Sequence, residues 1–229
     1  MLIIKFVYFT INVYVMNKVL VLNSSILLRK PLIKEHNIKL QYGKIRVNQY
    51  IKGFESLKNQ GVFDLFENIL LIDNTCRNTS KVPKKIARLL PENTVFNFTN
   101  KNTFGLLNKG AGVIDSLCHS KELINKYEFI FYFEPKLILN NRSFIDNFLD
   151  LPRNLFAISE EYPQVKSGYF GTESFELIKF LKSVNIQKMI DEKLNLENLI
   201  YDFFNQKSDF IKGTFTSWFD SGKRRYVDY

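Results

Sequence analysis

The stretch FIFYFEPK, residues 129–136, decides the fold. Its first five residues are all apolar and lack the alternation of a strand with one wet face, so they predict a central β-strand covered on both faces. Glu134 follows at the carboxyl end of that strand, directly before Pro135. Ligands bind at this edge in open α/β sheets. The stretch therefore predicts a layered α/β domain with a carboxylate at its ligand-binding edge.

Similar apolar runs alternate with amphipathic segments along the chain. Further strands are expected at KVLVLNSS, ENILLIDNT, NTVFNFTN and RNLFAIS, and helices at 110–126, after the two glycines of SGYFGTESFELIKFL, and near 194–205. Strands and helices alternating at this spacing favour parallel pairing with right-handed crossovers. We predict one Rossmann-like α/β domain, with a mostly parallel central sheet flanked by helices.

The chain length of 229 residues suits a single domain, which we expect over residues 16–229. Residues 1–15 are mainly apolar, but the run contains Lys5 and Asn12 and falls short of the ~20 residues that span a membrane. No small-residue cleavage site follows it. We expect residues 1–15 to be a mis-assigned start before Met16, or a loose extension.

The net charge of +9 is concentrated near the start of the chain: residues 1–50 hold eight Lys or Arg against one acidic residue. Such a region can meet phosphates on nucleotides, lipid headgroups or nucleic acid, or can be a solvated face. No RNP-like pattern, zinc-finger spacing or basic run interleaved with aromatics occurs, so nucleic acid is not the favoured partner. We expect a cytoplasmic protein, with peripheral membrane contact as an option.

Several enzyme classes lack their signatures here. The two cysteines are far apart and form no CxxC, which indicates a reducing compartment, and with two histidines a His-rich metal site is excluded. The first strand is not followed by G-x-G-x-x-G or by a phosphate loop, which argues against a dehydrogenase or a P-loop enzyme.

The segment FGLLNKGAGVIDSLCHSKELINKYEFIFYFEP, residues 104–135, resembles the central stretch of GT-A-fold glycosyltransferases of the family-2 type. In that family a glycine, a basic residue and a second glycine open a helix that leads into an apolar strand ending in acidic residues. Gly105, Lys109 and Gly112 match these positions, while Gly110 stands where many members have Asn. Glu134 stands at or beside the Asp-x-Asp position. Residues 17–205 follow the expected order of elements.

The resemblance implies roles in binding a nucleotide-sugar donor. Asp73, at a strand tip, would hold the nucleoside, although an Asx-type turn is an equal alternative. Lys109 would lie beside the diphosphate. Gly110 and Gly112 would let the backbone come close to a ligand or to a neighbouring strand, and a helix that begins there favours an anion. An exposed loop lysine is the alternative for Lys109.

The metal is the main departure from the family pattern, because hard cations such as Mg²⁺ or Mn²⁺ need several oxygen ligands and FEPK supplies one carboxylate. Three alternatives stay open. Glu134 ligates Mn²⁺ or Mg²⁺ with help from elsewhere, cations such as Lys109 or Lys136 neutralise the diphosphate without metal, or the site is inactive.

An inverting transferase also needs a base for the acceptor hydroxyl. The resemblance points to acids after the central strand, and we expect Glu161 or Glu173 to serve; Glu160, Glu197 and Asp202 are further acids there. Tyr169, Phe170 and Trp218 are expected to offer the acceptor sugar a stacking surface, although packing in the core is the common fate of a lone Trp.

Together these features predict a glycosyltransferase of polysaccharide biosynthesis that moves a sugar from a nucleotide-diphosphate donor to a glycan or a lipid-linked glycan. The alternative is a non-catalytic domain of the same fold that binds a nucleotide or a partner protein.

Overall fold

The computed structural model describes residues 17–28, 43–158, 164–220 and 225–228, with side chains described up to Ser217. The predictions for residues 1–15 and for Glu160 and Glu161 lie outside this part, as does the side chain of Trp218.

The described chain forms a seven-stranded sheet in the order β3-β2-β1-β4-β7-β6-β8. Its strands, in chain order, are β1 Lys18–Ser24, β2 Asn68–Asp73, β3 Thr94–Phe98, β4 Phe129–Phe133, β6 Leu155–Ile158, β7 Val165–Glu173 and β8 Asp209–Lys212. β1 pairs in parallel with both β2 and β4, and β2 with β3, so the predicted strands form the predicted parallel core.

β7 is where the sheet differs from the prediction. It runs antiparallel between β4 and β6, which makes it the one reversed strand among the seven. Its residues 168–173 were expected to turn through two glycines into a helix. Instead Gly171 lies within the strand. A Cβ at this position would come within 2.2 Å of the Phe148 ring, so the glycine makes room for that ring and does not form a turn.

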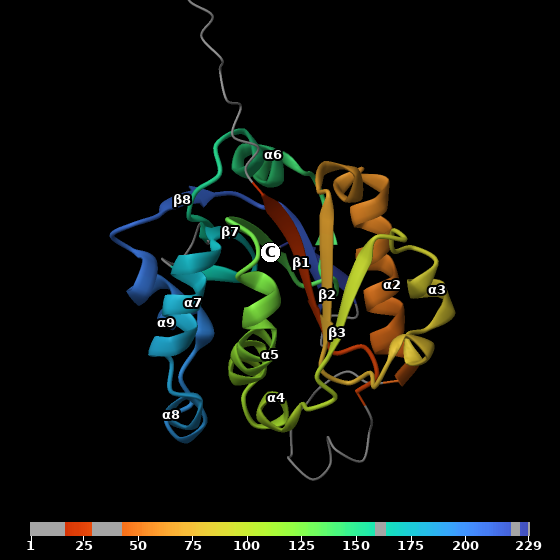
Figure 1. Cartoon of the computed structure of the whole chain (residues 1–229), viewed down its shortest axis with the longest axis horizontal. Helices are drawn as coiled ribbons and strands as arrows, with labels where there is room; N and C mark the ends of the chain where they lie inside the picture. Colours follow the sequence, from red (N-terminus) through yellow and green to blue (C-terminus); the bar gives the residue numbers. More distant parts are fainter. Residues whose placement is uncertain (1–16, 29–42, 159–163, 221–224, 229) are drawn as a thin grey trace, which may run out of the picture.

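Helices cover both faces of the sheet, and Figure 1 shows α2 and α3 on one side of β1, β2 and β3, with α5, α7 and α9 on the other. The helices are α2 Gly43–Asn59, α3 Lys84–Ala87, α4 Thr103–Leu107, α5 Lys109–Ile124, α6 Ser143–Asp150, α7 Ser174–Ser183, α8 Ile186–Asp191 and α9 Leu196–Phe204, with short 3-10 turns at Val62–Leu65 and Thr79–Lys81. Within the described ranges, no helix is both long and apolar enough to cross a membrane.

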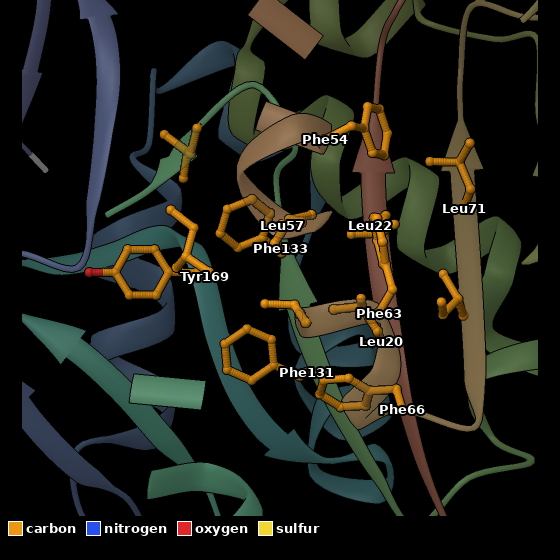
Figure 2. Close-up of a cluster of buried hydrophobic side chains, with 14 of the residues drawn as sticks. Leu20, Leu22, Phe54, Leu57, Phe63, Phe66, Leu71, Phe131, Phe133 and Tyr169 are labelled. Carbon is orange, nitrogen blue, oxygen red and sulfur yellow. The ribbon is translucent and has the colours of Figure 1, made fainter. Parts of the chain in front are cut away.

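Two cores lie on the two faces of the sheet because the central strands contain unbroken apolar runs, whose successive side chains point to opposite faces. Leu20, Leu22 and Phe131 pack under α2 and α6, while Val19, Val21 and Ile130 pack under α5, α7 and α9. Figure 2 shows the first of these cores, with side chains from β1, β2, β4 and α2. Buried on both faces, β1 and β4 form the rigid centre of the domain.

A small second sheet, β10-β9-β5, closes the described chain. It joins β5 Ile138–Leu139, which follows the FEPK stretch, to β9 Thr216–Asp220 and β10 Arg225–Asp228.

Candidate functional site

A cavity of about 590 Å³ opens at the carboxyl ends of β1 and β4. We call it the strand-end cavity. The chain leaves β1 toward β2 and β3 on one side and returns to β4 on the other, so the cavity lies at the point where the strand order reverses. Ligands of open α/β sheets bind at such a point. The volume is in the range of small-molecule sites.

Glu134 lines the strand-end cavity, as the sequence predicted from its place after β4. Its N–H donates to the Gly168 carbonyl at 2.8 Å, and its carbonyl accepts from the Leu137 N–H at 2.9 Å. The second bond closes a turn around Pro135, whose fixed φ suits the second position of such a turn. β4 therefore ends before a tight turn that contains Pro135 and Lys136.

Two side chains lie beside the Glu134 carboxylate. Lys136 Nζ lies 2.6 Å from Glu134 Oε2, and the Tyr132 hydroxyl lies close enough to the same carboxylate to interact with it electrostatically. Asn23 Nδ2 in turn donates to the Tyr132 hydroxyl at 3.1 Å. Burial alone would lower the pKa of Lys136, but the Glu134 carboxylate and Tyr50 together more than offset it and raise that pKa. The result is a fixed, charged pair on the cavity wall.

Lys109 begins α5, and it lines the strand-end cavity together with Gly110 and Gly112. Asn108 caps the helix by accepting from the Ala111 N–H at 3.1 Å, and the two N–H groups before Ala111 have no partner within the helix. Partial burial lowers the pKa of Lys109, with a further lowering by Lys136 and Arg46 that Glu134 and Glu197 oppose. Lys109 thus shares one electrostatic environment with the other charges of the cavity.

The glycines of this segment serve packing as well as the cavity. A Cβ on Gly112 would lie 2.4 Å from the Gly105 Cα, so α4 and α5 touch backbone to backbone at this pair. A Cβ on Gly110 would lie 2.7 Å from the Leu196 Cβ at the start of α9. The close approach that these glycines allow is to neighbouring helices, not to a strand, and the approach to a ligand stays a prediction.

Asp73 does not line the strand-end cavity and is fully buried. Its carboxylate oxygens accept hydrogen bonds of 2.6–2.9 Å from the Ser24 and Thr75 hydroxyls and from the backbone N–H groups of Ile26, Thr75 and Cys76. Both oxygens are thus engaged within the protein. The turn alternative describes Asp73, and the predicted contact with the nucleoside does not.

Tyr169 and Phe170 are also buried and lie outside the lining of the cavity. Figure 2 shows Tyr169 within the core beneath α2, and its hydroxyl lies near the Thr216 side chain. Phe170 stacks on Tyr132 at 4.7 Å between ring centroids in the opposite core. Neither ring is placed to stack on a sugar, because each packs in one of the two cores on either side of β7.

Glu173 lies at the other edge of the sheet. Because β7 is antiparallel, Tyr169 pairs with Phe133 at the cavity end of β4, and Glu173 pairs with Phe129 at the far end. Glu173 precedes α7 and is exposed. The predicted base at this position is therefore remote from Glu134.

Glu197 is the acidic residue that the structure brings to the strand-end cavity instead. It lies in the first turn of α9, and its Oε1 accepts a hydrogen bond of 2.6 Å from the Ser167 hydroxyl on β7. The connection before α9 is tied to α5, since Asn108 Nδ2 donates to the Met189 and Leu194 carbonyls. The sequence included Glu197 among the acids after the central strand, but it did not place this residue against the cavity.

A divalent metal would require several oxygen ligands at one point. In the described part of the chain, no three residues among His, Cys, Asp and Glu come close enough to hold an ion together. Glu134 Oε2 is already 2.6 Å from an ammonium group. The described side chains do not fit the predicted Mn²⁺ or Mg²⁺ site.

Comparison with known proteins relates the chain to others through its fold. No model of a protein family matches the sequence, and no curated protein matches it significantly. Among solved structures it is similar to a protein described as a nucleotide-diphospho-sugar transferase from Desulfovibrio desulfuricans, at 7% identity and a TM-score of 0.53, over 86% of this chain and 80% of that one.

A protein described as a glucose-1-phosphate thymidylyltransferase from Bacillus anthracis gives a TM-score of 0.52 at 10% identity, over 90% of each chain. A nucleotidyl transferase from Methanothermobacter gives 0.50 at 6% identity, over 86% of this chain and 87% of that one. At such identities the likeness concerns the arrangement of strands and helices. The chain has the Rossmann-like GT-A type of fold, which these nucleotide-sugar and nucleotidyl transferases share.

Proposed function

We propose that the protein is a glycosyltransferase that moves a sugar from a nucleotide-diphosphate donor to a glycan or lipid-linked glycan. The observation that carries this proposal is the strand-end cavity, in which Lys109, Lys136, Glu134 and Glu197 meet at the switch point of the sheet. Cations at a helix start suit a diphosphate, and carboxylates suit sugar hydroxyls. The fold shared with nucleotide-sugar transferases supports the same reading.

The donor diphosphate would lie between Lys109 and Lys136. The free N–H groups at the start of α5 add a partial positive charge there. Charge that builds up on the leaving diphosphate is then met by fixed positive groups, which is the usual source of electrostatic stabilisation in such reactions.

Glu197 is the candidate base for an acceptor hydroxyl if the transfer inverts the sugar. It lines the strand-end cavity, and Ser167 fixes its carboxylate by a hydrogen bond of 2.6 Å. A base must lie within hydrogen-bond reach of the proton that it removes. Glu161, which lies outside the described residues, stays a prediction for the same role.

The acceptor is proposed from the sequence. The excess of basic residues among the first 50 would attract an anionic membrane surface, where lipid-linked glycans are found. We expect peripheral binding to vesicles that contain anionic lipids, weakening as salt is added.

The first test is calorimetric titration with UDP, GDP, dTDP and CMP, followed by donor hydrolysis assays with the sugar donors of the nucleotide that binds. Binding with turnover supports the transferase. Binding without hydrolysis or transfer would indicate the alternative, a non-catalytic nucleotide-binding domain, and no binding to any of the four would overturn the proposal. Turnover of a nucleoside triphosphate with a sugar 1-phosphate would indicate nucleotidyl transfer.

A further inference from the structure

We propose that this site binds the diphosphate without a divalent metal, through Lys136, which Glu134 holds in place at the cavity wall. The inference rests on the proposed function and specifies how its donor is bound. Glu134 is then a positioning residue for an ammonium group, and not a metal ligand.

The first support is the geometry of the Glu134 carboxylate. Lys136 Nζ lies 2.6 Å from its Oε2, and the Tyr132 hydroxyl is a near neighbour of the same carboxylate. A metal ion would have to displace an ammonium group from this carboxylate, against the repulsion of that same charge.

The second support is the set of charges that line the strand-end cavity. Arg46 from α2, Lys109 from α5 and Lys136 after β4 are near enough to influence one another electrostatically, and all three line the cavity. Glu134 lies against Lys136, and Glu197 accepts from Ser167. An ammonium group is an established point-charge partner for phosphate, so these cations can take the place that a metal fills elsewhere.

The third support is a buried polar atom without a partner. Asn23 is 6% exposed and lines the cavity, and its Oδ1 has no hydrogen-bond partner, while its Nδ2 donates to the Tyr132 hydroxyl. An unpaired buried acceptor is costly. A ligand that brings a hydroxyl or N–H donor would satisfy it, whereas a bare pyrophosphate would not.

The experiment compares binding with and without a divalent metal. Binding of inorganic pyrophosphate and of the four nucleotides is measured by calorimetry in EDTA and again with Mn²⁺, using the full chain. We expect binding in EDTA to be as tight as with Mn²⁺. We expect Lys136→Gln to weaken pyrophosphate binding at least about tenfold, since it removes a charge-assisted hydrogen bond.

Two variants serve as controls for charge and for folding. Lys126→Gln removes an exposed lysine before β4, at the other edge of the sheet, and should leave binding unchanged. Lys136→Arg keeps the charge and should retain most of the affinity; if only Lys136→Gln had lost its fold, its thermal melting would reveal that.

Glu134→Gln distinguishes the two roles of the carboxylate. It should weaken pyrophosphate binding to the same extent in EDTA and with Mn²⁺, because the amide no longer holds Lys136 at the cavity wall. Loss of binding in EDTA that Mn²⁺ restores, together with a weakening by Glu134→Gln that is confined to the Mn²⁺ condition, would overturn the inference while leaving the transferase intact. Failure of every nucleotide to bind under both conditions would instead count against the proposed function.

Discussion

Ser167 on β7 donates a hydrogen bond of 2.6 Å to Glu197 on α9, joining two elements that lie thirty residues apart in the chain. The bond fixes a half-buried carboxylate on the wall of the strand-end cavity. Among the described acids that follow Lys136 in the chain, Glu197 is the one that lines this cavity. Glu197 is therefore the residue through which the transfer reaction is best tested.

Replacing Glu197 by Gln should lower turnover at least about 100-fold, because general-base catalysis contributes 10²–10⁴-fold in rate. Nucleotide affinity measured by calorimetry should stay within about twofold of the wild type. Glu173→Gln is the matched control, since Glu173 is exposed at the opposite edge of the sheet, and it should turn over normally. Equal losses in both variants would contradict the assignment.

Replacing Asp73 by Asn should destabilise the fold by about 3 kcal/mol, because hydrogen bonds to a charged group are each worth about 1.5–3 kcal/mol. The amide would turn an N–H group toward donors that now point at a carboxylate. Urea denaturation measures the change. Asp150→Asn, at an exposed position of α6, should stay within about 0.5 kcal/mol. A stable Asp73→Asn protein that has lost nucleotide binding would restore the original prediction for Asp73.

Replacing Gly171 by Ala should cost about 1–3 kcal/mol, the usual range for an overpacked core. The new Cβ would fall 2.2 Å from the Phe148 ring. In the double variant with Phe148→Leu, the loss of stability should be smaller than the sum of the losses in the two single variants, because the smaller side chain leaves room for the methyl group. Strictly additive losses by urea denaturation would show that the ring is not the obstacle.

The lowered pKa of Lys109 predicts how pyrophosphate affinity depends on pH. Partial burial, with the charges of Lys136 and Arg46, makes Lys109 lose its proton at a lower pH than an ordinary lysine. The attraction between Lys109 and pyrophosphate is complete below that pKa and disappears as the pH rises through it. Lys136, with its raised pKa, stays charged to a higher pH. Affinity should therefore fall on the alkaline side.

Lys109→Arg identifies the group responsible, because a guanidinium keeps its charge throughout this pH range. The alkaline fall should move to higher pH in this variant. If both proteins show the same profile by calorimetry, another group causes it.

The parallel centre of the sheet could be predicted because β1, β2 and β4 each contain an unbroken apolar run, at residues 19–22, 69–72 and 129–133, a pattern typical of strands buried on both faces. The position of Glu134 followed directly from it. β7 could not be predicted as a strand, since its glycines have the composition of a turn, and the reason for Gly171 is a ring from α6 far along the chain.

Part of the site was predictable from local sequence signals. Lys109 was predicted from the helix pattern that begins at this residue. Glu197 was not, because its place depends on how α9 packs against α5 and β7. Asp73 was misread because a buried turn and a ligand contact look alike in sequence at a strand tip; its burial decides between them.

The pairing of β4 with β7 has a consequence for folding accuracy. Tyr169 and Phe170 belong to opposite cores, and Glu134 N–H is bonded to the Gly168 carbonyl at the end of the same ladder. A slip of one residue would exchange the two rings between the faces of the sheet. Only a chain in which both cores are filled correctly holds Glu134 and Lys136 in these positions, so the binding site depends on the native alignment of these two strands.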